Sequence, residues 1–128
     1  MISPHAIVQT SRMGANVAIG EFSIVRSDVV LGNNVVVHPH SIINSGAIIG
    51  DNVEIFPGTV IGKEPKGAGA LSRVPVFERR VVVAPGCSIG PHAVIFYDVE
   101  IGESTLIGDG ASNGGTPVST RYSVAPRL

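Results

Sequence analysis

Residues 37–61 read VHPHSIINSGAIIGDNVEIFPGTVI, and this stretch decides the fold because every sixth position in it is aliphatic. These positions are Val37, Ile43, Ile49, Ile55 and Ile61. The same phase continues outward on both sides of the stretch. Its further members are Met13, Ile19, Val25, Leu31, Val83, Ile89, Ile95, Ile101 and Ile107. A period of six fits neither the 3.6-residue period of a helix nor the simple alternation of a flat strand.

A second repeat lies four positions after each aliphatic residue, where a small or β-branched residue stands. This set comprises Val17, Ser23, Val29, Val35, Ser41, Ala47, Val53, Thr59, Cys87, Ala93, Val99, Thr105 and Ala111. Side chains four apart on an extended segment share a face, so both repeats are expected to point inward. Glycine often follows the aliphatic residue, as at Gly50, and Gly, Asn and Asp tolerate the backbone angles of a corner.

The two repeats together predict short strands joined by corners, with three strands to each triangular coil of eighteen residues. Coils of this kind stack at the strand spacing of about 4.8 Å and bury their aliphatic side chains inside the column. No single coil can cover its own faces, so the stability of such a column is a sum over neighbouring coils. The sequence therefore predicts an all-β protein built as a parallel β-helix.

Segments such as Ile49-Gly50-Asp51-Asn52-Val53-Glu54 and Ile101-Gly102-Glu103-Ser104-Thr105-Leu106 resemble the repeat of the hexapeptide-repeat acyltransferases. The resemblance is nearest to the nucleotide-sugar and lipid A types. It implies a left-handed parallel β-helix of about six coils over residues 1–112, with one extruded loop at 63–82. Residues 113–128 are expected to form an irregular last coil or a tail, because the repeat loses its phase there.

Composition limits the possible functions. The chain has 128 residues, enough for one domain, and its formal net charge of -1 gives no electrostatic basis for binding nucleic acid. It contains no apolar run long enough to cross a membrane and no recognisable secretion signal at the N-terminus. The single cysteine, Cys87, cannot form an internal disulfide. These features predict a cytoplasmic protein.

The loop at 63–82 is the main interruption of the repeat, since 22 positions separate Ile61 from Val83. Five of the nine Lys and Arg residues of the chain lie in it. We expect four of these cations to hold the phosphates of coenzyme A or of a substrate. These residues are Lys63, Lys66, Arg73 and Arg79. The alternative is a solvated loop without a ligand.

The resemblance implies transfer of an acyl group, in the simplest case acetyl, from acyl-CoA to an amine or hydroxyl of a sugar or nucleotide-sugar. That reaction uses a general base, most often histidine, and it requires no metal. His92 and His40 are the expected bases, in one column two coils apart. The loop is expected to leave from the same part of the column, so that His92, the loop and a neighbouring subunit border one pocket. Tyr97 and Asp98 are expected to bind polar substrate groups there, although either histidine could instead be a simple corner residue.

Two further expectations concern assembly and the competing functions. The resemblance implies a homotrimer, and residues 29–50 contain no Lys, Arg, Asp or Glu, which suits a subunit interface. A non-catalytic β-helix that binds or scaffolds is the alternative to an enzyme. A zinc hydratase of the γ-carbonic anhydrase type is disfavoured, because His38 and His40 are two residues apart and no histidine lies five residues from His92.

Overall fold

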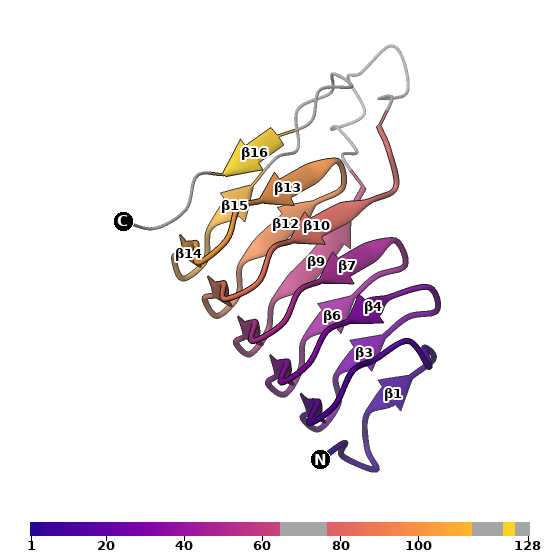
Figure 1. The fold of residues 1–128 in the computed structure, drawn as a ribbon. Coiled ribbons are helices and arrows are strands. Elements are labelled where there is room, and N and C mark those ends of the chain that lie inside the picture. The colour runs from indigo at the N-terminus through magenta and orange to yellow at the C-terminus, as the bar shows by residue number, and fades with distance from the viewer. Residues whose placement is uncertain (65–76, 114–121, 125–128) are drawn as a thin grey trace, which may run out of the picture.

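The computed structural model describes residues 1–64, 77–113 and 122–124, and it forms a triangular column of parallel strands (Figure 1). Its strands belong to three sheets, here called A, B and C. Sheet A contains β2 (Ala18–Ile19), β5 (Val36–Val37), β8 (Glu54–Ile55), β11 (Ser88–Ile89) and β14 (Leu106–Ile107). Sheet B contains β1 (Ile7–Val8), β3 (Ile24–Val25), β6 (Ile42–Ile43), β9 (Val60–Lys63), β12 (Val94–Phe96) and β15 (Ser112–Asn113). Sheet C contains β4 (Val30–Leu31), β7 (Ala47–Ile49), β10 (Val81–Val83), β13 (Val99–Ile101) and β16 (Tyr122–Val124).

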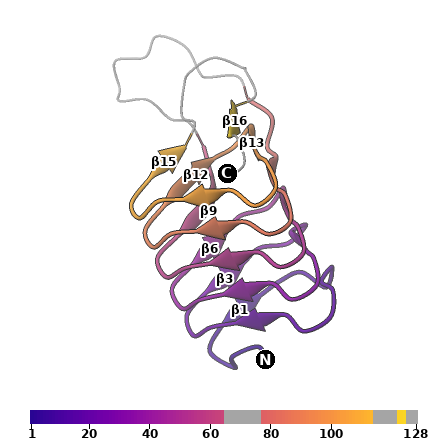
Figure 2. The same ribbon diagram turned by 60° about the vertical axis from the view of Figure 1, so that its left-hand side comes forward.

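The chain visits sheets A, B and C in turn and then returns to sheet A one level higher (Figure 2). The register confirms the predicted coil of eighteen residues, since Val37 pairs with Ile55 and Ile43 pairs with Ile61. All pairings between the named strands are parallel, so equivalent positions of successive coils lie directly over one another. Within the described residues there is no helix of the length and hydrophobicity needed to cross a membrane.

The core is built from the two sequence repeats. Of the fourteen aliphatic residues in phase, thirteen are fully buried, and the remaining one, Met13, packs half-buried against the core in the first coil. The small residues of the second repeat fill the corners. The three polar ones between sheets A and B satisfy their hydroxyls locally. Ser23 Oγ donates to His38 O at 2.8 Å, Ser41 Oγ to Phe56 O at 3.1 Å and Thr59 Oγ1 to Gly90 O at 3.0 Å.

Apart from the corner after Ile61, where the loop leaves, each corner from Asn16 to Gly110 contains a residue with positive φ, three positions after the inward aliphatic residue. Most of these residues are Asn, Asp or Gly, which adopt the left-handed region at little cost. The other members of the set are His40, His92, Phe22 and Ser104. Their φ values lie between 54° and 64°. All the non-glycine residues of this set except Asp98 have exposed side chains, so these corners can differ chemically without disturbing the core.

The loop enlarges one coil without displacing the strands on either side of it. Ile55 pairs with Ile89, 34 positions later, whereas the coils directly before and after advance by eighteen, from Val37 to Ile55 and from Ile89 to Ile107. After the loop, Val81 stands at a position of the small-residue repeat, because it pairs with Ala47 below and Val99 above, which both belong to that repeat. At the C-terminal end β16 pairs with β13 in sheet C. The tail therefore contributes a strand to the column at Tyr122–Val124.

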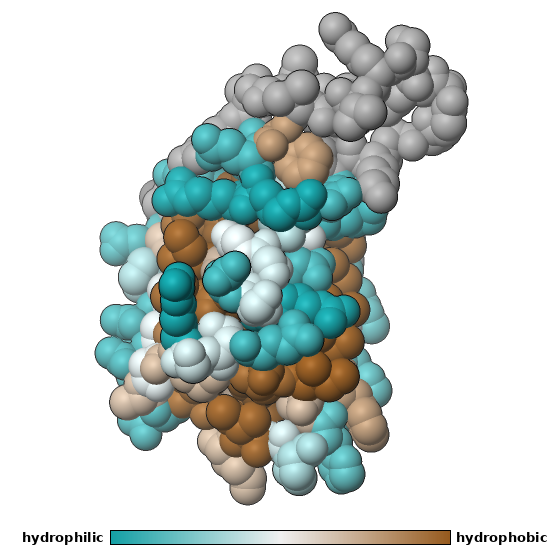
Figure 3. Space-filling view, turned by 90° about the vertical axis from the view of Figure 1, so that its right-hand side faces the viewer, coloured by the Kyte–Doolittle hydropathy of each residue, from teal (hydrophilic) through white to brown (hydrophobic). Residues whose placement is uncertain are grey.

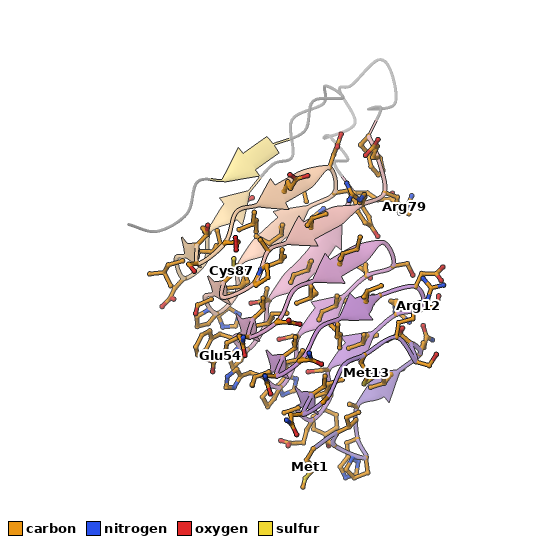
Figure 4. All side chains as sticks on the ribbon, in the orientation of Figure 1. Met1, Arg12, Met13, Glu54, Arg79 and Cys87 are labelled. Carbon is orange, nitrogen blue, oxygen red and sulfur yellow. The ribbon has the colours of Figure 1, made fainter. Side chains whose placement is uncertain are left out.

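Cys87 occupies a core position, as its place in the small-residue repeat predicts (Figure 4). Its thiol is fully buried and donates to Gly102 O at 3.0 Å. Burial raises the pKa of the Cys87 thiol above its usual value, so the reactive thiolate is scarce at neutral pH. We expect native protein to react with a thiol reagent at least about a hundred times more slowly than denatured protein, as followed by absorbance. Rapid labelling of the native protein would contradict the packing described here.

Candidate functional site

A cleft of about 510 Å³ lies at the corner between sheets B and C, where the loop leaves β9 and rejoins the column before β10. Figure 3 faces this corner and shows hydrophilic side chains lying among hydrophobic ones. The residues that line the cleft are Arg26, Asn44, Ser45, Val60, Gly62, Lys63, Glu64, Arg79 and Tyr97. Three of them are cations and one is a carboxylate, so the cleft is positively charged.

The floor of the cleft is held by hydrogen bonds to the backbone. Tyr97 Oη donates to Ser45 O at 2.7 Å, and Asn44 Nδ2 donates to Gly62 O at 2.9 Å. Gly62 lies at a bulge, where Lys63 rather than Gly62 pairs with Phe96, and it has a φ of 89°. A Cβ atom on Gly62 would lie 3.1 Å from the Tyr97 ring. Glycine is therefore required here to bring β9 close to the tyrosine.

Two of the cations lie over aromatic rings. Lys63 Nζ is 5.4 Å from the centre of the Phe96 ring. The Arg79 guanidinium lies 5.0 Å from the Tyr97 ring and 5.5 Å from the Phe77 ring, and its Nη2 is 2.7 Å from Glu64 Oε1. The hydrogen bond to Glu64, followed by that to Tyr97, raises the pKa of Arg79 above its usual value. The guanidinium is thus fixed, permanently charged and partly open to solvent, which suits it to bind an anion such as a phosphate.

The histidines lie at a different corner, between sheets A and B. His40 and His92 occupy one column of corner residues with Gly58 between them, which confirms the prediction that they are two coils apart. Phe22 continues the column toward the N-terminus and stacks between His5 and His40, with ring centres 5.9 Å and 5.4 Å apart. These corner side chains form a row of rings along the outside of the column.

His92 itself is exposed and lies against the backbone of Gly58. A Cβ atom on Gly58 would lie 2.4 Å from His92 Nδ1, so the imidazole fills the space that any other residue at 58 would need. The Nδ1 and Cε1 atoms of the ring are the ones nearest to Gly58, and the His92 side chain as a whole is exposed. His38 has a different environment, since its Nε2 is 2.7 Å from Glu54 Oε2 and its ring stacks on Phe56 at 4.9 Å.

The prediction that the loop leaves from the same part of the column as His92 is wrong. Each strand of sheet B runs from the histidine corner to the cleft corner. His92 precedes β12 and Tyr97 follows it, which places them at opposite edges of the sheet, roughly 15 Å apart for five extended residues. Figure 4 shows Arg79 of the cleft on one side of the column and Glu54, the partner of His38, on the other. Among the described residues that line the cleft there is no histidine.

The other predicted residues divide between these places. Lys63, Arg79 and Tyr97 come together in the cleft. Asp98 does not line it, because it is a buried corner residue with a φ of 64° whose backbone N donates to Arg80 O at 2.8 Å. Two further predicted cations, Lys66 and Arg73, lie outside the described residues. In the part of the chain that the structure describes, no group of three or more His, Cys, Asp or Glu could hold a metal ion.

Sequence reasoning missed four polar side chains of the cleft. They are Arg26, Asn44, Ser45 and Glu64. Arg26, Asn44 and Gly62 stand eighteen residues apart, each directly after an inward aliphatic residue of sheet B. That spacing was available in the sequence and would have placed the first two beside the loop.

Sheet B also presents an apolar outer face between the two corners. Its outward residues are aliphatic in five successive coils: Ile7, Ile24, Ile42, Val60 and Val94. The outward column of sheet C is interrupted by charge at both ends, at Arg12 and Glu100. The uncharged segment 29–50, by contrast, runs through all three sheets, so its composition alone does not single out one face.

Comparison with known proteins supports the repeat and the fold. Residues 10–45 match the sequence family described as bacterial transferase hexapeptide (six repeats). No match to a curated protein was found. Among solved structures, the chain is similar to a His-to-Ala mutant of GDP-perosamine N-acetyl transferase from Caulobacter crescentus in complex with CoA and GDP-perosamine. That likeness has a TM-score of 0.59 and 20% identity over 88% of this chain and 51% of the other.

A second similar structure is LpxA, a UDP-N-acetylglucosamine acyltransferase from Bacteroides fragilis. Here the TM-score is 0.51 and the identity 24%, over 88% of this chain and 55% of the other. The chain therefore spans about half the length of these two proteins. The predicted left-handed parallel β-helix and the resemblance to hexapeptide-repeat acyltransferases are confirmed.

Proposed function

We propose that this chain, a hexapeptide-repeat protein with the left-handed β-helix fold of acyltransferases, is an acyltransferase that works as a homotrimer in the cytoplasm. It moves an acyl group, most simply acetyl, from acyl-CoA to an amine or hydroxyl of a sugar or nucleotide-sugar. The observation that carries the proposal is the apolar face of sheet B, which has a cationic cleft at one edge and an exposed histidine at the other.

The cleft suits the phosphorylated part of such substrates. Arg26, Lys63 and Arg79 place three positive charges around one hollow, and charge-assisted hydrogen bonds to phosphate are among the strongest that side chains make. Coenzyme A and nucleotide-sugars both contain a diphosphate. CoA and GDP-perosamine are bound in the similar N-acetyl transferase structure, which supports ligands of this class here.

The general base would come from a second subunit. An aliphatic face five coils high is apolar enough for a subunit interface, where charge is depleted. His92 and Tyr97 flank the same strand, β12, and so lie at nearly the same level of the column. Rotation about a threefold axis parallel to the column leaves that level unchanged. In such a trimer the partner subunit's His92 lies at the same height along the column as Tyr97, one coil above Lys63.

The chemistry follows from this arrangement. The imidazole of His92 takes the proton of the acceptor amine or hydroxyl as the acceptor attacks the thioester carbonyl. A tetrahedral intermediate forms, the C–S bond breaks, and the thiolate of coenzyme A leaves with a proton. The cations of the cleft bind the phosphates of acyl-CoA, and this contact positions its thioester near the interface between two subunits.

Calorimetric titration with CoA tests the proposal most directly. We expect the wild-type protein to bind CoA, and the double variant Arg26→Gln/Lys63→Gln to bind it at least about a hundredfold more weakly, because each of the two lost phosphate contacts to a charged group removes roughly 1.5–3 kcal/mol. Arg12→Gln is the matched control, since Arg12 lies outside the cleft. The proposal of an acyl-CoA enzyme would be rejected if the protein did not bind CoA at millimolar concentration. It would also be rejected if no amino-sugar nucleotide tried accepted an acyl group.

A non-catalytic binding or scaffold protein is the second candidate. One observation favours it: His92 stands at the same left-handed corner position as Asn16, Asn34 and Asn52, with an ordinary φ of 59°. A corner residue needs no catalytic role. Binding of CoA without acyl transfer to any acceptor would favour this candidate over the enzyme.

A further inference from the structure

The Arg79 guanidinium already holds an anion in the structure, and that anion belongs to the chain itself. Glu64 Oε1 lies 2.7 Å from Arg79 Nη2, and both residues line the cleft. Glu64 directly follows β9, and Arg79 lies two residues before β10. A side-chain carboxylate therefore occupies part of the anion-binding capacity of the cleft.

Arg79 is held in place by contacts other than this carboxylate. Its guanidinium lies over both Tyr97 and Phe77, whose rings are 5.8 Å apart with an interplanar angle of 14°. Tyr97 is fixed in turn by its hydrogen bond to Ser45 O. The guanidinium would thus keep its position if Glu64 moved away, and its planar set of donors would remain available to another anion.

We propose that Glu64 is an internal counter-ion which an incoming phosphate displaces, so that the cleft binds phosphate groups by exchange and discriminates against carboxylates. The proposal concerns the same cleft as the proposed function and names the ligand chemistry that it selects. A carboxylate ligand that replaces Glu64 exchanges one monoanion for another and gains nothing at Arg79. A phosphate or diphosphate carries more charge and also reaches Lys63 and Arg26, so only this class of ligand makes the exchange favourable.

The strength of the Glu64–Arg79 pair fits an exchangeable contact. The side chains are 34% and 54% exposed, respectively, and exposed ion pairs of this kind are weak. Competition by Glu64 should therefore lower the affinity for phosphate by about two- to fivefold, without closing the site.

A double-mutant cycle with pyrophosphate as the probe tests the exchange. Calorimetric titration compares the wild type, Glu64→Gln, Arg79→Gln and the double variant, all as full-length protein at one ionic strength. We expect Glu64→Gln to bind pyrophosphate about two to five times more tightly than the wild type, and to change nothing once Arg79 is replaced. Acetate at the same ionic strength should not compete with pyrophosphate. Glu103→Gln removes the same charge at an exposed corner away from the cleft and should leave the affinity unchanged.

Three results would overturn the proposal: no binding of pyrophosphate by the wild type or Glu64→Gln, an unchanged affinity in Glu64→Gln, or an equal gain in Glu103→Gln. A gain that persists in the Arg79→Gln background would also do so, since it would show a general charge effect. Pyrophosphate exchange without any acyl transfer would reject the proposed enzyme and leave this inference standing. The two ideas can therefore fail separately.

Discussion

Replacing His92 with alanine is expected to lower the rate of acyl transfer by about 10²–10⁴-fold, the usual contribution of a general base. The affinity for CoA should stay within about twofold of the wild type, because His92 does not line the cleft. The effect should therefore appear in kcat, measured by release of free coenzyme A thiol with an amino-sugar nucleotide as acceptor. The exposed side chain leaves the core untouched, so the variant should fold normally.

The histidine corner supplies its own controls for this experiment. His5→Ala removes a ring that stacks only on Phe22 at the N-terminal end of the row, and it should leave kcat unchanged. His40→Ala tests the second predicted base, two coils below His92. A full loss of activity in His40→Ala with none in His92→Ala would assign the base to His40. Wild-type activity in both His40→Ala and His92→Ala would exclude these two histidines as the base.

Ile42→Asp is expected to dissociate the trimer. Ile42 stands in the middle of the outward aliphatic column of sheet B, so the substitution would place a carboxylate within the proposed seam. The apolar burial lost is about 1.5–3 kcal/mol per subunit, and three copies together raise the dissociation constant of the trimer by about a thousandfold or more. Light scattering should show monomers, and acyl transfer should fall with the trimer if the base comes from a second subunit.

Ile48→Asp is the matched control for this variant. Ile48 also points outward and is 37% exposed, but it belongs to sheet C. We expect it to remain trimeric and active. Dissociation by Ile48→Asp and not by Ile42→Asp would move the interface to sheet C, and a monomeric wild type would remove the shared site altogether.

The fold could be predicted almost completely from the sequence, because it depends on a local rule repeated many times. Each inward aliphatic residue, such as Ile43 or Ile61, is buried for the same reason as its neighbours eighteen residues away. An error at one hexad would have been corrected by the others. Even the alignment of Ile55 with Ile89 across the loop follows from simply resuming the next face, and the pairing confirms it.

The site could be predicted only in part, because it depends on contacts that break the rule. Arg79 reaches Tyr97 and Glu64 through the path of the inserted loop, which no periodicity describes. Bulging of β9 at Gly62, which brings Tyr97 against the strand, is likewise a local exception. The histidines were placed correctly relative to one another because they follow the repeat.

The prediction that the loop leaves from the same part of the column as His92 is wrong for a simple physical reason. The repeat determines the face on which a residue lies, but not the end of the strand at which its side chain stands. His92 precedes β12 and Tyr97 follows it, so one coil level contains both ends of a strand of sheet B. Residues at one level of a column can thus be far apart within a subunit and close between subunits.

The resumption of pairing at Val81 after the long excursion has a consequence for how this architecture can change. Stacking, and not residue count, determines where β10 joins sheet C, since Val81 aligns with Ala47 although 34 positions separate them. Extra chain at that corner costs mainly closure entropy, which grows only with the logarithm of its length. At the corner between β9 and β10, inserted segments of very different length could therefore replace one another while the coils on either side keep their structure.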